Sequence, residues 1–294
     1  MVMTETQKFK KSDTQFAIIV RSMAKNKMAL LGLAILLILL LTAIFADVIA
    51  PYKAAEQNLK NTFQAPSAQH LFGTDKFGRD IFSRVVYGTR LSFMVGFIAI
   101  GIATIVGGIL GAIAGYYEGQ VDNVIMRLMD ILMAIPNVLL AIAIVATLGT
   151  GLVNLMIALG ISAIPRFARV VRATTLTIRK EEYIEAAVAS GLNDFQIIAT
   201  HILPNCLPPI IVQISLGIAD AILMAAGLSF IGLGIQPPNP EWGTMLSEGR
   251  QFIRGYAYMT YFPGLAIVLT TLSLNLLGDG LRDALDPKMK NVAG

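Results

Sequence analysis

Two carboxylates inside long apolar runs are the residues of this sequence whose chemistry most needs explanation. Asp130 and Asp220 each interrupt a stretch that is otherwise almost entirely hydrophobic. A carboxylate at the centre of a membrane-spanning helix costs about 2.5 to 3.5 kcal/mol, so it marks an ion or solute path or is neutralised by a partner. For Asp130 we favour the second interpretation, a carboxylate near the membrane interface that pairs with Arg127 one turn earlier.

Asp220 lies near the middle of its run, which it shares with Gln213 and Ser215. One interpretation places these three polar residues along a translocation pathway. The other makes Asp220 a neutral, hydrogen-bonded carboxyl packed within a helix bundle. If Asp130 and Asp220 carry ions, the chain is a secondary transporter driven by an ion gradient, and this is the alternative function.

Residues for catalysis, metal binding and nucleotide binding are missing. One cysteine (Cys206) and two histidines (His70 and His201) do not make a typical structural zinc site or a disulfide framework. The sequence has no GxxxxGK[ST] phosphate loop, and its apolar runs lack the paired Asp or Glu-x-x-His clusters of hydrolytic membrane sites. We expect no catalytic residue, metal or cofactor in this chain. No nucleic-acid partner is expected either, because basic residues flank apolar runs without aromatic platforms among them.

The composition is that of a polytopic membrane protein. The 294 residues are 55% hydrophobic and 14% charged, and their mean hydropathy is +0.67. The pattern predicts an all-α fold with six transmembrane helices. We expect the following organisation: a cytoplasmic tail at 1–27, a first transmembrane helix at 28–50, an extracytoplasmic loop with an amphipathic interfacial helix at 51–90, a core of five spans at 91–280, and a cytoplasmic tail at 281–294.

Boundaries within this scheme come from charge and from small residues. The run after the basic N-terminal tail reaches spanning length, which favours an uncleaved anchor over a signal peptide. The distribution of Lys and Arg favours cytoplasmic termini. In the core, spans are predicted at 91–115, 125–147, 151–171, 207–233 and 261–277. Gly107, Gly111 and Gly115 recur every four residues, so we expect this face of the second span to pack closely against another helix.

One polar segment, at 173–205, separates the fourth and fifth spans. Its Ala-rich first helix should end at Gly191 in a left-handed cap. Asn193 and Gln196 have the spacing of a capping box and should open a second helix, which we expect Pro204 to close. From helix chemistry alone, this segment is a helical hairpin joining two spans, and the hairpin identifies no partner.

The residues of this hairpin also carry a family resemblance. Glu185-Ala186-Ala187, then Gly191 and Leu203-Pro204, resemble the EAA loop of binding-protein-dependent ABC importer permeases. His201 departs from the usual isoleucine of that pattern. The string at 70–90, with its FGTD, GRD and SR elements, independently resembles the dipeptide, oligopeptide and nickel branch of the same family.

The resemblance implies a type I ABC importer permease in the cytoplasmic (inner) membrane. It implies a second, homologous permease, one or two ATPases that bind ATP and Mg²⁺, and an extracytoplasmic binding protein. The solute is expected to be a dipeptide, an oligopeptide or a related small solute such as nickel. The coupling residues are then Glu185, Ala186, Ala187, Gly191, Leu203 and Pro204. Gly191 would turn the first helix so that Ala186 and Ala187 face a cleft on the ATPase.

Overall fold

A computed structural model describes residues 23–285, and these are almost entirely helical. No β-strand occurs within that range, where the chain has a single isolated bridge between Thr74 and Asp80. The all-α prediction is therefore confirmed. Most of the predicted N-terminal tail (residues 1–22) and the last residues of the predicted C-terminal tail (286–294) lie outside the described residues.

Five helices are long and apolar enough to cross a membrane. They are α2 (Lys27–Ile44), α4 (Ile81–Tyr117), α7 (Leu152–Ile178), α10 (Leu203–Phe230) together with the turns before it, and α12 (Tyr258–Leu285). A sixth crossing is made by α5 (Gly119–Met133) and α6 (Asn137–Leu148) if this bent pair counts as one span. The structure is thus consistent with the six spans predicted from the sequence.

The third predicted span, 125–147, is not one straight helix. α5 and α6 meet at an angle of 87° across the short break before Asn137. Pro136 stands in this break, where its ring and missing N–H prevent the helix of α5 from continuing. The apolar run was recognised correctly, but its proline divides it into two helices.

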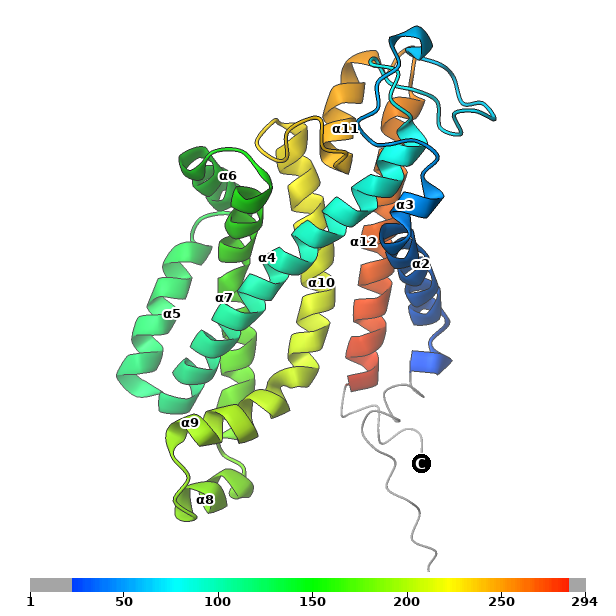
Figure 1. The fold of residues 1–294 in the computed structure, drawn as a ribbon. Coiled ribbons are helices and arrows are strands. Elements are labelled where there is room, and N and C mark those ends of the chain that lie inside the picture. The colour runs from blue at the N-terminus through cyan, green and yellow to red at the C-terminus, as the bar shows by residue number, and fades with distance from the viewer. Residues whose placement is uncertain (1–22, 286–294) are drawn as a thin grey trace, which may run out of the picture.

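The short elements gather at the two ends of the molecule. One end carries α8 (Glu182–Ala189), α9 (Asp194–Ile197) and the π-helical turn η2 (Ile198–Ile202), and the described chain starts and finishes at this end (Figure 1). The opposite end carries the segment at 50–80 and α11 (Figure 1). The short elements toward this end are α3 (Ala46–Ile49), η1 (Leu59–Asn61), α11 (Trp242–Gly249) and η3 (Arg250–Phe252).

Close packing of α4 on α7 forms the centre of the bundle. A Cβ atom at Gly107 would lie 2.7 Å from the carbonyl oxygen of Ile164, and one at Gly115 would lie 2.7 Å from Cβ of Thr175. Gly111 likewise faces the backbone of α7. The small-residue stripe therefore faces protein, as predicted, because only glycine lets the two backbones approach this closely.

The helix predicted before residue 90 is not a separate element but the beginning of α4. Asp80 caps α4 by accepting a hydrogen bond from the Ser83 N–H at 2.7 Å, and the residues after it form the first turns of that long helix. Arg84 does not face solvent beside Asp80, since its side chain is 1% exposed and pairs with Glu248. Both charged side chains are thus paired inside the protein, Asp80 with His70 and Arg84 with Glu248.

Candidate functional site

The turn at Gly191 has the predicted left-handed conformation. Gly191 has a φ of +84°, and the hydrogen bonds that close α8 run from its N–H to the Val188 carbonyl (3.0 Å) and from the Leu192 N–H to the Ala187 carbonyl (3.3 Å). Among the described residues, no atom lies within 4 Å of where a Cβ at Gly191 would stand. Glycine is therefore required here by backbone conformation and not by crowding.

The predicted capping box at Asn193 is also present. The Gln196 N–H donates to Asn193 Oδ1 at 2.9 Å, and the Asn193 N–H donates to Gln196 Oε1 at 3.1 Å. Pro204, however, does not close the helix that begins here. The chain passes from α9 through the π turn η2 directly into α10, and Pro204 lies in the first turn of α10. A proline is tolerated in a first turn because its missing N–H has no partner to lose there.

The two short helices are anchored on the bundle by their apolar faces. Ile184, Ala187, Ile197 and Ile202 are buried in one cluster together with residues from the ends of α4, α7 and α10. Ala187 is therefore turned toward the chain's own interior, whereas Glu185 and Ala186 are exposed. The expectation that both alanines face a partner is corrected, since Ala187 follows Ile184 by three residues and shares its buried face of α8.

Polar contacts add to this anchor. The Tyr116 hydroxyl donates to Asp194 at 2.9 Å, and Arg179 pairs with Glu118 at 2.6 Å. Outside the anchored face, the side chain of Phe195 is 79% exposed, and Tyr183 and Val188 are exposed as well. A hollow of about 670 Å³ lies beside α8, and Glu185 is part of its lining. This end of the molecule thus presents an apolar and charged surface on a firmly attached support.

A second set of functional candidates lies on α7, where Arg166, Arg169 and Arg172 follow one another at three-residue intervals. Each pairs with a carboxylate of a neighbouring helix, and we call these residues the charged stripe. The pairs are Arg166 with Asp220 of α10 at 2.6 Å, Arg169 with Asp130 of α5, and Arg172 with Asp122 of α5.

The charged stripe corrects three expectations from the sequence. Asp130 pairs with Arg169 and not with Arg127. Asp220 is not a neutral carboxyl packed in the bundle, because its side chain is 58% exposed and forms an ion pair with Arg166. The predicted fourth span ended at residue 171, but α7 continues to Ile178, so Arg172 lies within the helix together with Arg166 and Arg169. Their regular spacing was the signal that could have identified them.

Exposure of these charges restricts what the stripe can face. Arg166 lies near the middle of α7 and is 49% exposed, like its partner Asp220. A charge at such depth is too costly to leave against lipid, at about 2.5 to 3.5 kcal/mol for each charged residue at the centre of a span. The face of α7 that carries the stripe must therefore meet water or another protein.

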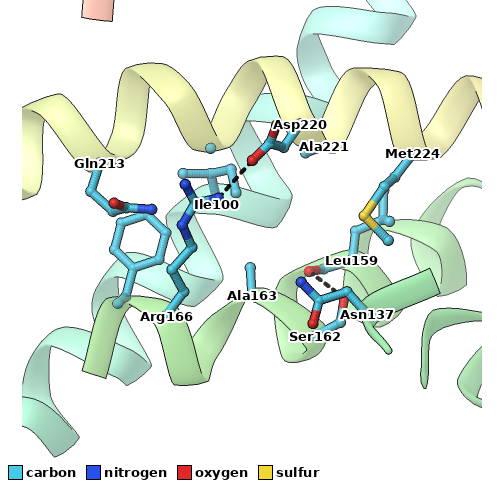
Figure 2. Close-up of a pocket in the computed structure, with 12 residues that line it drawn as sticks. Ile100, Asn137, Leu159, Ser162, Ala163, Arg166, Gln213, Asp220, Ala221 and Met224 are labelled. Carbon is cyan, nitrogen blue, oxygen red and sulfur yellow. Dashed lines mark hydrogen bonds and ion pairs between the residues drawn. The ribbon is translucent and has the colours of Figure 1, made fainter. Parts of the chain in front are cut away.

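Two hollows adjoin the stripe. The larger, about 700 Å³, is lined by Asp122, Asp130, Arg169 and Arg172 together with other residues of α5. The smaller, about 40 Å³, lies between α7 and α10, and Figure 2 shows Arg166, Asp220 and Gln213 around it. Of the three pathway residues predicted from sequence, Asp220 and Gln213 are thus brought together.

Ser215 is not part of that arrangement. It lies on a different face of α10, where its hydroxyl donates to the Leu274 carbonyl of α12 at 3.0 Å. Its buried position and this hydrogen bond describe a helix-packing contact. Helical spacing is the signal that could have separated the two, because Gln213 and Asp220 are two turns apart on one face of the helix, whereas Ser215 lies on another face.

The opposite end of the molecule contains a third group of charges, which we call the cap cluster: Asp75, Arg79, Arg84 and Glu248. Arg79 pairs with Asp75 and also donates to Glu248 at 2.9 Å, while Arg84 reaches the same Glu248 at 3.3 Å. The side chains of Arg79 and Arg84 are 2% and 1% exposed. Nearby, His70 contacts Asp80 at 2.9 Å. The cluster ties the segment before α4 to α11.

This combination of crossing helices, an anchored helical hairpin at one end and charges along inner helices defines a multi-span membrane permease. The chain belongs to the family of binding-protein-dependent transport system inner membrane components, whose model matches residues 107–291. A second family model, the N-terminal TM domain of oligopeptide transport permease C, matches residues 14–66. The family resemblance inferred from the sequence is confirmed.

Relatives match nearly the whole chain. A dipeptide transport system permease protein, DppC, of Alkalihalophilus pseudofirmus is 54% identical over 92% of this chain and 89% of the relative. A di/tripeptide transport system permease protein of Pseudomonas aeruginosa is 45% identical over 93% and 92%. A glutathione transport system permease protein of Escherichia coli is 48% identical over 92% and 89%.

Among solved structures, an inward-facing form of the MetNI methionine ABC transporter contains a chain of the same fold. The TM-score is 0.56 at 19% sequence identity, and the match covers 69% of this chain and 96% of that chain. The likeness confirms the ABC importer permease fold.

Proposed function

We propose that this chain is a transmembrane permease subunit of an ATP-driven importer that takes up dipeptides or other short peptides. The observation that carries the proposal is the anchored hairpin of α8 and α9, with its EAA sequence, on the ends of α4, α7 and α10. The relatives at 45 to 54% identity are permeases of dipeptide, di/tripeptide and glutathione transport systems, and they support the choice of solute.

The hairpin is suited to transmit a movement. Ile184, Ala187 and Ile197 are buried against the bundle, so a displacement of α8 would displace the helices on which it rests. In the proposed mechanism an ATPase binds the exposed face around Glu185 and Ala186. ATP-driven closure of two such ATPases then switches the permease between two states, which couples ATP binding to access of the solute.

Further components supply what this chain lacks. We propose a heterodimer with a homologous permease, one or two kinds of ATPase subunit that bind ATP and Mg²⁺, and an extracytoplasmic binding protein. The chain itself is non-catalytic in this proposal. The end with α8 and α9 is assigned to the cytoplasm, which places both termini there and the cap cluster on the outer side. Gln213 and Asp220 are assigned to the solute pathway.

The alternative, a secondary transporter, was suggested by the carboxylates within the spans. Both Asp130 and Asp220 are held by arginines of α7. Ion pairs of this kind neutralise a charge within a span and give a reason for the carboxylates that does not involve ion transport. The observation that suggested the alternative therefore no longer favours it.

Transport and co-purification distinguish the two functions. The complex is purified through this chain, and uptake of a labelled dipeptide is measured in vesicles with the binding protein present. An ATPase subunit should co-purify, and uptake should stop when ATP is depleted while the proton gradient is maintained. Uptake that survives ATP depletion and is abolished by an uncoupler would establish the secondary transporter instead.

A further inference from the structure

Gln213 is a buried polar residue whose amide nitrogen has no acceptor in the described part of the chain. The residue is 8% exposed, and within residues 23–285 its Nε2 has no hydrogen-bond partner. Figure 2 shows its side chain extending from α10 into the space beside Arg166. A buried N–H without an acceptor costs free energy, and native proteins rarely leave one. An acceptor brought by a bound molecule would satisfy it.

The ion pair of Arg166 and Asp220 closes the same space. The two side chains approach to 2.6 Å, and the cavity that remains beside them, about 40 Å³, holds little more than a water molecule. Gln213 precedes Asp220 by two helical turns, so both lie on the same face of α10. A solute that enters here must therefore separate Arg166 from Asp220.

The need to compensate both charges determines which kind of solute can separate Arg166 from Asp220. Because both side chains are about half exposed, separating the pair leaves each charge hydrated but without its charge-assisted hydrogen bond. A molecule with both an ammonium and a carboxylate replaces each partner, because the ammonium pairs with Asp220 and the carboxylate with the guanidinium of Arg166. A neutral solute, or one with a single charge, leaves at least one group uncompensated.

We propose that Arg166, Asp220 and Gln213 form a subsite that binds the free amino and carboxyl termini of a zwitterionic peptide during its passage. Gln213 donates to an oxygen of the peptide, either a backbone carbonyl or the terminal carboxylate. The subsite rests on the proposed peptide transport and deepens it. The pair of Arg169 and Asp130 borders a much larger hollow and has no buried amide beside it among the lining residues, so it is not assigned this role.

Occupancy of the subsite can be measured without the binding protein, which would otherwise select the peptide first. Ala163 lines the cavity, and Cys206 is the only cysteine of the chain. In the complete permease and ATPase complex carrying Ala163→Cys and Cys206→Ser, a small thiol reagent alkylates the new cysteine. Millimolar dialanine should slow this alkylation. N-acetyl-dialanine and dialanine amide should each protect about tenfold less well, the effect of losing one charge-assisted contact.

Single substitutions assign each terminus to its residue. With Asp220→Asn, protection should no longer distinguish dialanine from its N-acetyl form but should still distinguish it from the amide. Arg166→Gln should show the reverse pattern. Asp47→Asn, which removes a comparably exposed ion pair with Arg90 at the opposite end of the molecule, should leave all protection unchanged.

Gln213→Met provides a variant whose folding is not at risk. Because Nε2 makes no hydrogen bond within the described chain, replacing the amide by an apolar side chain of similar length should not destabilise the protein. Protection by dialanine should nevertheless weaken. Equal protection by dialanine and both blocked forms, or full protection in Gln213→Met, would overturn the subsite. Peptide uptake by the wild-type complex is measured in parallel, and its absence would overturn the proposed function instead.

Discussion

The cap cluster and the charged stripe use the same chemistry in opposite surroundings. Both consist of arginines paired with carboxylates from distant parts of the chain. In the cap cluster, Arg79 and Arg84 are 2% and 1% exposed and share Glu248. In the charged stripe, Arg166 and Asp220 are each about half exposed, although they lie within spanning helices.

This difference separates a structural role from a transport role. The charges of the cap cluster are buried and paired inside one chain. The cluster therefore stabilises the contact between the segment before α4 and α11. In the stripe, the pairs Arg166–Asp220 and Arg169–Asp130 keep about half of their side-chain surface exposed. Exposed pairs exchange partners at little cost, because water or a new ligand replaces what is lost, whereas a buried pair cannot be opened without leaving a bare charge.

The largest effect is expected from Glu248→Ala. The substitution leaves Arg84 without its carboxylate partner and Arg79 with Asp75 alone, in a nearly dry environment. Breaking a buried pair in this way destabilises a protein by about 3 to 5 kcal/mol. Thermal unfolding of the purified complex in detergent should show a marked fall in Tm, with Glu248→Gln intermediate. An unchanged Tm would show that the cap cluster does not stabilise the protein.

A smaller effect, on coupling more than on folding, is expected from Gly191→Val. The φ of +84° is strained for a β-branched residue by about 1 to 3 kcal/mol, while no described atom obstructs the added side chain. The α8 hairpin should be displaced and ATP-dependent uptake should fall. Gly191→Asn is the matched control, since asparagine tolerates this conformation far better. Full uptake and full ATPase retention in Gly191→Val would make the hairpin a simple linker.

Asp130→Asn directly tests an exposed ion pair of the charged stripe. The pair with Arg169 is about half exposed, and pairs of this kind contribute roughly 0 to 1 kcal/mol. The Tm should therefore hardly change, in contrast to Glu248→Ala. If the two substitutions lower Tm equally, burial does not distinguish the cluster from the stripe.

The smallest expected effect concerns Glu241, which caps α11 beside the cap cluster. Its carboxylate accepts from the Gly243 and Thr244 N–H groups at 2.9 and 2.8 Å, but burial raises its pKa above the ordinary value. The folded protein then binds this proton more tightly than the unfolded chain does. The contribution of Glu241 to stability is greatest below the ordinary glutamate range and declines slightly as pH rises through the folded-state pKa. A Tm series against pH should show this decline, and Glu241→Gln should remove it.

The sequence by itself determined the features that depend on neighbouring residues and on periodicity. The membrane class and the six crossings follow from apolar run lengths, which reflect the thickness of a bilayer. The capping box at Asn193 and the left-handed turn at Gly191 follow from local backbone chemistry. The regular spacing of Gly107, Gly111 and Gly115 identified a packing face, because small residues at this spacing let another helix approach closely.

Only the tertiary structure decided which charges meet and which side chains turn inward. Arg84 pairs with Glu248, and Arg169 pairs with Asp130. The partners are so far apart in the sequence that helical spacing cannot predict these pairs. The burial of Ala187 and the unused amide of Gln213 depend on which helices pack beside them. Local rules act within one turn of a helix, whereas ion pairing and burial depend on distances that exist only after the helices have packed together.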